Sequence, residues 1–352
     1  MYRKQLIFKR KVFITLFTGI LILSGCGQDE NIKSGGNTPL TEAVNHPANE
    51  GTDTKLIEAE AKAEDIYYCS EGGIDLSRAV HRCVSDGKNI YFVHGEPDLY
   101  VMPIGTDEHN PANIDNPEEM DVCNIALDTQ GRIHLLMAGQ DNEKWFIWRL
   151  DESYQVDKAI DISAYFETRH MPLWFLIDKD DNYYFQWAIE RNGIIVDYEG
   201  VFKHRFTPES LGIRWIYEAA VGRDGQIYIV YSNSDVKLEI GKLNVEKCFI
   251  ESENPTLCFS GNETFNAMSS GTDTNLLLFS PYSGVWAYDN ENGIIENRVP
   301  LSEIGFDSDT EFYPLTFLPD GRLILLSQTV NDNHIDDESF IDWLLKYIPV
   351  GK

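Results

Sequence analysis

Aromatic and charged side chains gather directly before several short apolar stretches of this sequence. Such side chains suit the binding of a sugar, a peptide or an amphipathic small molecule, because small-ligand pockets combine apolar rings with a few polar groups. We therefore predict a ligand pocket built from these segments. Its predicted residues are Arg169, His170, Trp174, Arg214, Trp215, Tyr217, Phe312 and Tyr313. The alternative is that the aromatic rings only fill interfaces between structural units.

Acidic side chains are abundant, but the sequence singles out no catalytic set. Glycoside hydrolysis needs two carboxyl groups with different pKa values a few ångströms apart. Among 57 Asp and Glu residues, some pair meets that condition by chance. A lactonase-like metal site could be assembled from Glu218, Asp121 and Asn266, although their register is not uniform. We predict no catalytic residue, no metal and no cofactor.

Two further patterns are better explained by structural roles than by catalysis or metal binding. His81, His134 and His170 lie in different parts of the chain and are expected to be packed or solvated. The segment 178–182, Asp-Lys-Asp-Asp-Asn, has the alternating oxygens of a calcium loop. It lacks the central glycine and the later glutamate of an EF-hand, so it is predicted to be an acidic hairpin turn.

The cysteines leave their pairing open. After Cys26 they are Cys69, Cys83, Cys123, Cys248 and Cys258. A disulfide between Cys248 and Cys258 would join neighbouring strands, and Cys69 could pair with Cys83 or with Cys123. Buried free thiols are the preferred interpretation. No CxxC pair is present, so neither a zinc site nor a redox site is predicted.

A repeat underlies the predicted pocket: a polar turn of five residues, then a dense apolar run. The runs begin at residues 90, 133, 183, 227, 276 and 323. In three copies Gly131, Gly225 or Gly321 is the fourth residue of a predicted type I turn. Asp128 and Pro319 occupy positions that such turns favour. Because another apolar stretch precedes each turn, each copy predicts a β-hairpin.

More strands follow most of the hairpins. Third strands are predicted at 145–148, 201–204, 238–241, 285–288 and 343–346, with a fourth in some copies, such as 159–162 and 248–250. Four short strands about every 45 residues are typical of a β-propeller. The predicted fold class is all-β, a six-bladed β-propeller of four-stranded blades. A seven-bladed propeller and a pair of β-sandwiches are the alternatives.

The two ends of the repeat region predict how the ring closes. The last copy supplies a third strand near 343–350 but no chain for a fourth. The segment 65–69 is a strand without a hairpin partner. Placing it as the outer strand of the last blade, with Ile66 alongside Leu345, pairs both free edges.

The first 26 residues predict export. Five basic residues (Arg3, Lys4, Lys9, Arg10 and Lys11) precede an apolar run over 12–23. As a helix this run spans roughly 18 Å, too short for a hydrocarbon core of about 30 Å, so it is predicted to be a secretory signal. Leu23-Ser-Gly-Cys26 resembles the bacterial lipoprotein processing motif. That resemblance implies that Cys26 carries the lipid and becomes the first residue. An ordinary signal peptide with a chance cysteine is the alternative.

These signals divide the chain into three parts. We predict a signal peptide over 1–25, a flexible tether over 26–64 and the propeller over 65–352. The tether is rich in polar and acidic residues and has few large apolar side chains to bury. Two or more acyl chains, palmitate among them, would hold the protein stably at the cell membrane, facing the extracytoplasmic side.

Charge limits the partners. The formal net charge is −28, and residues 1–25 contain no acid, so the remainder is more acidic still. Such a surface argues against nucleic acid, whose binding depends on Lys and Arg. The predicted partners are the membrane, through the lipid anchor on Cys26, and a small-molecule, glycan or protein ligand.

With the lipoprotein motif and the hairpin repeat together, the chain resembles a bacterial cell-surface lipoprotein with a six-bladed propeller. Its repeats are similar to NHL and SMP-30/gluconolactonase-like propellers. They are also similar to propeller halves that precede a solute-binding domain in larger lipoproteins, although we expect no second domain here. The resemblance implies a lipid-anchored binding or interaction module. The alternatives are an extracytoplasmic hydrolase or lactonase for carbohydrate-like substrates, and an accessory to a solute transporter or sensor.

Overall fold

The polar turns of the repeat set the local structure. In the computed structural model, the backbone N–H of Gly131 donates to the carbonyl of Asp128 over 2.9 Å. Gly131 has φ +76°, a left-handed conformation that glycine adopts without strain. Asp181 takes the corresponding place in its copy with φ +57°, and its N–H donates to Asp178 over 3.0 Å. The predicted hairpin turns are therefore confirmed, including the acidic turn at 178–182.

The structure describes residues 64–69, 82–93, 99–106, 108–139, 142–167, 170–187, 191–234, 237–251, 259–260, 265, 267–289, 294–304, 312–329 and 342–350. The predictions for Cys26, the signal peptide, most of the tether and Arg169 lie outside these ranges. No helix within them is long and apolar enough to cross a membrane.

Six antiparallel sheets, here called blades, follow one another along the chain. Blade 1 contains β2 (Cys83–Ser85), β3 (Asn89–Val93), β4 (Leu99–Pro103) and β5 (Asn110–Pro111). Blade 2 contains β6 (Asp121–Leu127), β7 (Ile133–Ala138), β8 (Trp145–Leu150) and β9 (Val156–Asp161). Blade 3 contains β10 (Trp174–Ile177), β11 (Tyr183–Gln186), β12 (Gly193–Val196) and β13 (Phe202–Phe206).

The second half repeats the pattern. Blade 4 contains β14 (Trp215–Val221), β15 (Ile227–Ser234), β16 (Lys237–Asn244) and β17 (Phe249–Glu251), and β18 (Phe259–Ser260) also pairs with β16. Blade 5 contains β19 (Ala267–Ser269), β20 (Leu276–Ser280), β21 (Gly284–Asp289) and β22 (Ile294–Pro300), followed by the short helix α1 (Leu301–Ile304). Blade 6 contains β23 (Phe312–Phe317), β24 (Leu323–Thr329), β25 (Asp342–Ile348) and β1 (Glu64–Cys69).

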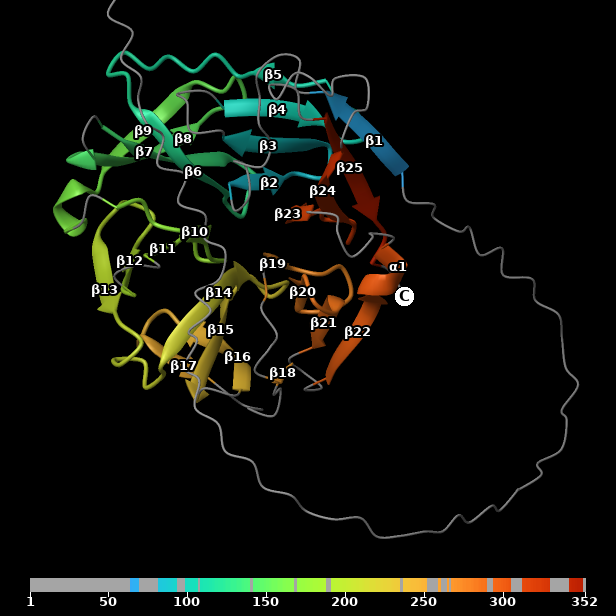
Figure 1. The fold of residues 1–352 in the computed structure, drawn as a ribbon. Helices are drawn as coiled ribbons and strands as arrows, with labels where there is room; N and C mark the ends of the chain where they lie inside the picture. Colours follow the sequence, from blue (N-terminus) through green and yellow to red (C-terminus); the bar gives the residue numbers. More distant parts are fainter. Residues whose placement is uncertain are drawn as a thin grey trace, which may run out of the picture. The chain divides into compact units, whose positions relative to one another are not determined.

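The blades form a closed ring. The first strands β2, β6, β10, β14, β19 and β23 contact one another in this order, and β23 contacts β2. Figure 1 shows these strands around the centre of the ring, with the later strands of each blade farther out. The predicted fold class is confirmed: the protein is a six-bladed β-propeller with four-stranded blades.

The closure also follows the prediction. Strand β1 pairs antiparallel with β25, and Ile66 lies opposite Leu345. Blade 6 therefore has the order β1-β25-β24-β23, in which the first strand of the described chain completes the last sheet. Figure 1 shows β1 along the outer edge of this blade.

The core lies between the blades. Every residue of β7 and of β20 is buried, because each second strand is covered by a neighbouring blade on both faces. Between blades 2 and 3, for example, Leu136 and Trp145 pack in one cluster with Phe175 and Phe185. This arrangement explains why the second strands are apolar at nearly every position rather than at alternate ones.

One strand assignment was wrong. The segment 201–204 was predicted as the third strand of its blade, but β13 is the fourth strand. The third strand is β12, only four residues long, and it begins at Gly193. A methyl group at Gly193 would lie 2.1 Å from Cζ of Phe206 and 2.7 Å from the carbonyl oxygen of Phe185. A residue with no side chain is thus required where the strands approach closely, although the residues that follow, Ile194, Ile195 and Val196, are typical of a strand.

Candidate functional site

The six first strands enclose a central channel with a volume of about 510 Å³. Its wall takes residues from every blade. They include Cys83, Asn124, Trp174, Glu218, Ala267 and Leu315 toward one end, and Asp128, Lys179, Gly225 and Pro319 toward the other. We call the end at which the first strands begin the mouth, and the opposite end the hairpin end.

Hydrogen bonds between neighbouring turns brace the hairpin end. The N–H of Lys179 in blade 3 donates to the carbonyl of Gly225 in blade 4 over 2.7 Å. The N–H of Arg223 in blade 4 donates to Asn275 in blade 5 over 2.9 Å. The N–H of Thr129 in blade 2 likewise donates to the Asp181 carboxylate over 3.2 Å. These contacts join the turns of neighbouring blades at the hairpin end.

One residue from each blade stands at the same level of the mouth. Each is the cross-strand neighbour of the fourth residue in the apolar run that forms the second strand of the same blade. In blades 1 to 5 these residues are Arg82, Asn124, Trp174, Glu218 and Ala267. In blade 6 the matching residue is Tyr313, whose side chain is outside the description. The level thus carries one cation, one amide, one indole and one carboxyl group.

Glu218 and Trp174 form a buried pair in the channel wall. They are only 4% and 6% exposed. The indole Nε1 of Trp174 donates to Oε1 of Glu218, which also accepts the backbone N–H of Ala219 over 3.2 Å. Burial raises the pKa of Glu218 to about 7, and the two hydrogen bonds act in the opposite direction. At neutral pH this carboxyl group therefore populates both its neutral and its ionised form.

A β-bulge places Glu218 in the channel. The pairing of β14 with β15 shifts between Ile216 and Glu218, so Tyr217 has no partner. Tyr217 is 41% exposed, whereas Glu218 is buried. A bulge adds one residue to a strand and re-aims the side chains beside it. The same irregularity occurs in β6 before Asn124.

Asn124 and Arg82 complete the polar part of the mouth. Asn124 is 2% exposed, and its amide donates to the carbonyl of Leu173 over 3.2 Å, which links blades 2 and 3. Arg82 is half-buried beside Cys83, and its guanidinium contacts the sulfur of Met171 at 3.0 Å. Met171 precedes the first strand of blade 3, so Arg82 reaches from blade 1 past blade 2 at the mouth.

The structure separates the residues predicted from the sequence to bind ligand. Trp174 lines the channel. His170, Arg214 and Tyr217 are exposed near the starts of β10 and β14. Trp215 is half-buried, and the guanidinium of Arg191 lies 3.3 Å from its ring centroid. Phe312 and Tyr313 lie in β23, but their side chains are outside the description, and so is the whole of Arg169.

Three residues of the mouth were not in the predicted pocket. Asn124 and Arg82 were missed, and Glu218 was considered only for a metal site with Asp121 and Asn266. Asp121 is exposed and does not line the channel, whereas Asn266 lies outside the described ranges. Counting back from each hairpin turn would have found the level that Glu218 shares with Trp174, because the turns were correctly predicted.

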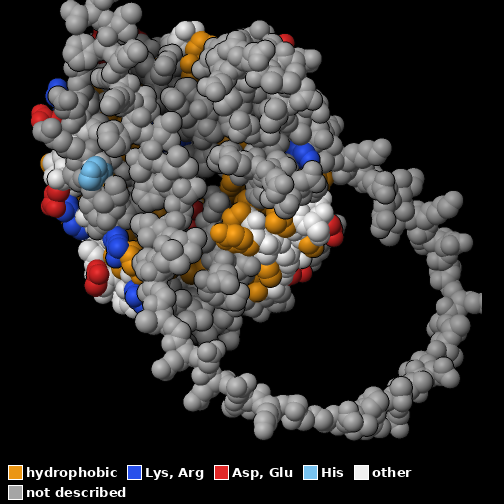
Figure 2. All heavy atoms as spheres, viewed as in Figure 1, with side chains coloured by type: hydrophobic (Ala, Val, Ile, Leu, Met, Phe, Trp, Pro, Cys, Tyr) orange, Lys and Arg blue, Asp and Glu red, His pale blue; other side chains and the backbone are white. Residues whose placement is uncertain are grey.

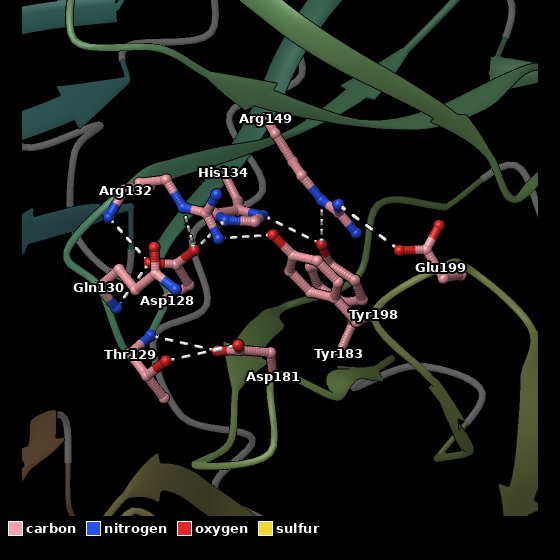
Figure 3. Close-up of polar contacts among 10 residues, drawn as sticks. All are labelled: Asp128, Thr129, Gln130, Arg132, His134, Arg149, Asp181, Tyr183, Tyr198 and Glu199. Atoms are coloured by element: carbon pink, nitrogen blue, oxygen red, sulfur yellow. Dashed lines mark hydrogen bonds and ion pairs between the residues drawn. The ribbon is translucent and has the colours of Figure 1, made fainter.

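A second polar cluster is buried between blades 2 and 3 (Figure 3). Nε of Arg149 donates to the Tyr183 hydroxyl over 3.0 Å. The oxygen of this hydroxyl lies 3.1 Å from Nδ1 of His134. Nε2 of His134 lies 3.0 Å from the Asp128 carboxylate. Burial lowers the pKa of His134, so the ring is neutral, and the pattern assigns its proton to Nε2. The Arg149 guanidinium also stacks on the ring of Tyr198, 3.3 Å from its centroid.

Metal-binding and thiol chemistry are not prominent in the described part of the chain. No group of three or more His, Cys, Asp or Glu side chains in those ranges could hold a metal ion. A groove of about 390 Å³ with acidic residues lies at the hairpin end of blades 3 and 4, but lysines also line it. Cys83 and Cys123 are buried free thiols and Cys248 is a half-buried one. Burial raises the pKa of Cys123 to about 12, which makes this thiol unreactive.

The described surface differs between the centre and the rim. Figure 2 shows hydrophobic side chains gathered over blade 5, beside the centre of the ring. Acidic and basic side chains lie along the outer rim near β13 in the same view. On this face, the described hydrophobic side chains of blade 5 thus lie toward the axis of the propeller.

Comparisons with known proteins find only distant structural likenesses. No protein-family model matches the chain, and no curated protein matches it. Virginiamycin B lyase from Staphylococcus aureus is 10% identical with a TM-score of 0.46, over 82% of this chain and 99% of that one. A PQQ-bound aldose sugar dehydrogenase from Streptomyces coelicolor is 11% identical with a TM-score of 0.45, over 82% and 99%. An oligogalacturonate lyase with manganese is 11% identical with a TM-score of 0.43, over 75% of each chain. Such likenesses carry no argument about activity.

Proposed function

We propose that the protein is a lipid-anchored, extracytoplasmic propeller that binds a small organic ligand at the mouth of its central channel. The observation that carries the proposal is the buried Trp174–Glu218 pair in the wall of a channel of about 510 Å³. Ligand pockets of about 300–1,000 Å³ combine apolar walls with a few placed polar groups. An indole, a carboxyl group and an amide at one level provide such a set.

The location rests on the sequence. The basic residues, the apolar run and Leu23-Ser-Gly-Cys26 together resemble a lipoprotein signal. The test compares the wild type with Cys26→Ala in cell fractionation. The wild type is expected in the membrane fraction and the variant in the soluble extracytoplasmic fraction. An equal distribution of the two proteins would refute the lipid anchor.

The binding test uses the propeller with its N-terminal strand, residues 59–352. A small-molecule library is screened by thermal shift, and the hits are titrated by tryptophan fluorescence. Trp174→Phe and Glu218→Gln are expected to weaken the hits about tenfold or more, because the first removes the N–H that holds Glu218 and the second replaces its carboxyl group with an amide that carries no charge. Trp286→Phe is the matched control, since its indole donates to Ser283 over 2.7 Å in blade 5. Hits that bind both channel variants as well as the wild type would refute the site.

A hydrolase or lactonase is the second candidate, and one observation favours it. Burial raises the pKa of Glu218 to about 7, the value that suits a general acid or base at neutral pH. A hydrolase is expected to turn over a hit that contains an ester, lactone or glycosidic bond. Glu218→Gln would then abolish turnover more than binding. Unchanged hits after long incubation leave the binding function and remove the hydrolase.

A further inference from the structure

Glu218 differs from the other charged side chains of the channel wall. Those that line the channel are Asp128, Asp178, Lys179 and Glu218. Asp128 and Asp178 each accept two backbone N–H groups of their own hairpin turns, over 2.8–2.9 Å. Lys179 is an exposed residue of such a turn. Glu218 alone among the four lies at the mouth.

The fold does not require a carboxyl group at this level. The same level is occupied by Asn124, Trp174 and Ala267 in blades 2, 3 and 5. Ala267 shows that a small apolar side chain is compatible with the position. Because a buried carboxyl group costs free energy unless partners compensate for it, its presence here indicates binding rather than packing.

The carboxyl group of Glu218 is held through one oxygen and leaves the other for a ligand. Oε1 accepts the indole N–H of Trp174 and the backbone N–H of Ala219. Among the described residues, none donates to Oε2. Glu218 is 4% exposed, yet it lines the channel. A donor that arrives through the channel can therefore bond to Oε2.

The charge of the wall favours a cation as this donor. The described residues that line the channel include no arginine, and their one lysine, Lys179, lies at the hairpin end. Arg82 does not line the channel, and its guanidinium contacts the sulfur of Met171. A ligand carboxylate at the mouth would thus meet Glu218 with no cation in the wall beside it. An ammonium group would form a charge-assisted hydrogen bond there, and the net charge of −28 attracts cations.

The rest of the wall favours a ligand with a single charge. Many of the lining residues between the two ends are apolar, including Leu176, Val221 and Met268. A second ammonium group would have to reach Asp128 or Asp178, whose carboxylates already accept from Arg132 and Asn182. In the described ranges no group of three or more His, Cys, Asp or Glu could hold a metal ion. These features disfavour polyamines and metal ions.

Resting on the ligand-binding function proposed above, we propose that the mouth of the channel binds a small primary monoamine, with its ammonium group on Oε2 of Glu218 and its apolar body along the wall. A primary ammonium group has N–H donors to give to this oxygen, whereas a quaternary one has none.

The experiment pairs amines with alcohols of the same carbon skeleton. The amines are butylamine, hexylamine, benzylamine, 2-phenylethylamine and tryptamine. Each compound is titrated by calorimetry into residues 26–352 carrying Cys26→Ala, at pH 8, where most of Glu218 is ionised. At least one amine is expected to bind about tenfold or more tightly than its alcohol. The trimethylated form of that amine should lose most of this advantage, because it has no N–H.

Matched variants separate charge from fold. Glu218→Gln should bind each amine and its alcohol alike, because the amide carries no charge. Glu152→Gln makes the same change at an exposed position and should keep the preference for the amine. Melting temperatures check that both variants are folded.

Proton release gives a second readout in the wild type alone. Tyr184 and Tyr231 belong to the cluster around Trp174, and Asp128, Asp178 and Lys179 are the other charged groups of the wall. At pH 7 about half of the Glu218 side chains carry a proton, which the ammonium group displaces. Amine binding should therefore release about half a proton, measured from the heats in two buffers of different ionisation enthalpy. Glu218→Gln should release none, which assigns the proton to Glu218. Proton uptake, or no release, by the wild type would contradict the proposal.

The outcomes separate this proposal from ligand binding in general. If no amine binds better than its alcohol, while library hits bind and depend on Trp174 and Glu218, the amine proposal is overturned and ligand binding stands. A preference for the amine that persists in Glu218→Gln would also overturn it. If neither the library nor the amines and alcohols bind, both proposals are overturned.

Discussion

At the scale of single residues, the central channel contains a carboxyl group that is buried, although its ionised form would be better solvated in water. Glu218 is buried, and only an indole and one backbone amide donate to it. The folded protein therefore disfavours its ionised form, which raises its pKa from the ordinary 4.5 to about 7. A residue of this kind reduces stability at neutral pH, which is common at functional sites.

The first prediction concerns Glu218→Gln. Between pH 4.5 and about 7 the folded protein holds a proton on Glu218 that the unfolded chain has lost. The free energy of unfolding therefore falls as the pH rises through this range, by up to about 3 kcal/mol from this one group. Glutamine cannot ionise, so the variant should become progressively more stable than the wild type over the same range. Urea unfolding at several pH values measures the difference.

Glu152→Gln is the control for this prediction, since Glu152 is exposed. Its stability should follow the wild type at every pH. Parallel profiles for Glu218→Gln and the wild type would show that Glu218 titrates normally in the folded protein.

The second prediction concerns the buried cluster of Figure 3. Tyr183→Phe removes the hydroxyl that accepts from Arg149 and contacts His134. Because Nη2 of Arg149 already has no hydrogen-bond partner in the described structure, losing a second contact leaves this buried cation poorly satisfied. The expected loss is about 1–3 kcal/mol of unfolding free energy, measured in urea.

Tyr91→Phe is the matched control for the tyrosine. The Tyr91 hydroxyl donates to Asp86 over 2.9 Å, and Asp86 is exposed, so water can replace the lost bond. This variant should lose clearly less stability. Equal losses in the two variants would mean that the buried cluster contributes no more than a surface hydrogen bond.

At the scale of elements, the sequence predicts what local chemistry determines. The six hairpins were found because Asp, Gly and Pro occupy fixed positions in tight turns. The third strand of blade 3 was missed because β12 has four residues and starts at Gly193, where packing excludes a side chain. The bulge at Tyr217 was equally invisible, since nothing local marks an unpaired residue in a strand. The spacing from the predicted turn gives the level of Glu218, but which side chain faces the channel depends on that bulge and could not be predicted from the sequence.

The third prediction tests the close approach at Gly193. In Gly193→Ala the new methyl group would lie 2.1 Å from the Phe206 ring and 2.7 Å from the carbonyl of Phe185, so β12 or β13 must move. We expect a loss of about 1–3 kcal/mol, as for an overpacked core. Gly139→Ala is the control, because its methyl group would meet only the Lys144 side chain and carbonyl, at 3.2 Å or more. Equal stability of the two variants would contradict the assigned packing of blade 3.

At the scale of the whole molecule, both the channel and its closure depend on the ring. The closure could be predicted because two free strand edges, one at each end of the repeat region, need partners. The composition of the mouth could not, because it combines single residues from different blades, more than 40 positions apart along the chain. Only the three-dimensional ring brings Arg82 and Glu218 to one level.

The last prediction tests the closure. Removal of residues 1–69 deletes β1 and leaves the edge of β25 unpaired, whereas removal of residues 1–63 retains the strand. Strand β1 pairs along six positions, from Glu64↔Tyr347 to Cys69↔Asp342. Its loss should lower the unfolding free energy by about 3 kcal/mol or more, and the bare edge should promote self-association. A synthetic peptide of residues 64–69, added in excess, should restore the melting temperature by pairing with β25, and a scrambled peptide should not. If both truncated proteins melt alike and stay monomeric in sedimentation, the ring does not depend on this strand.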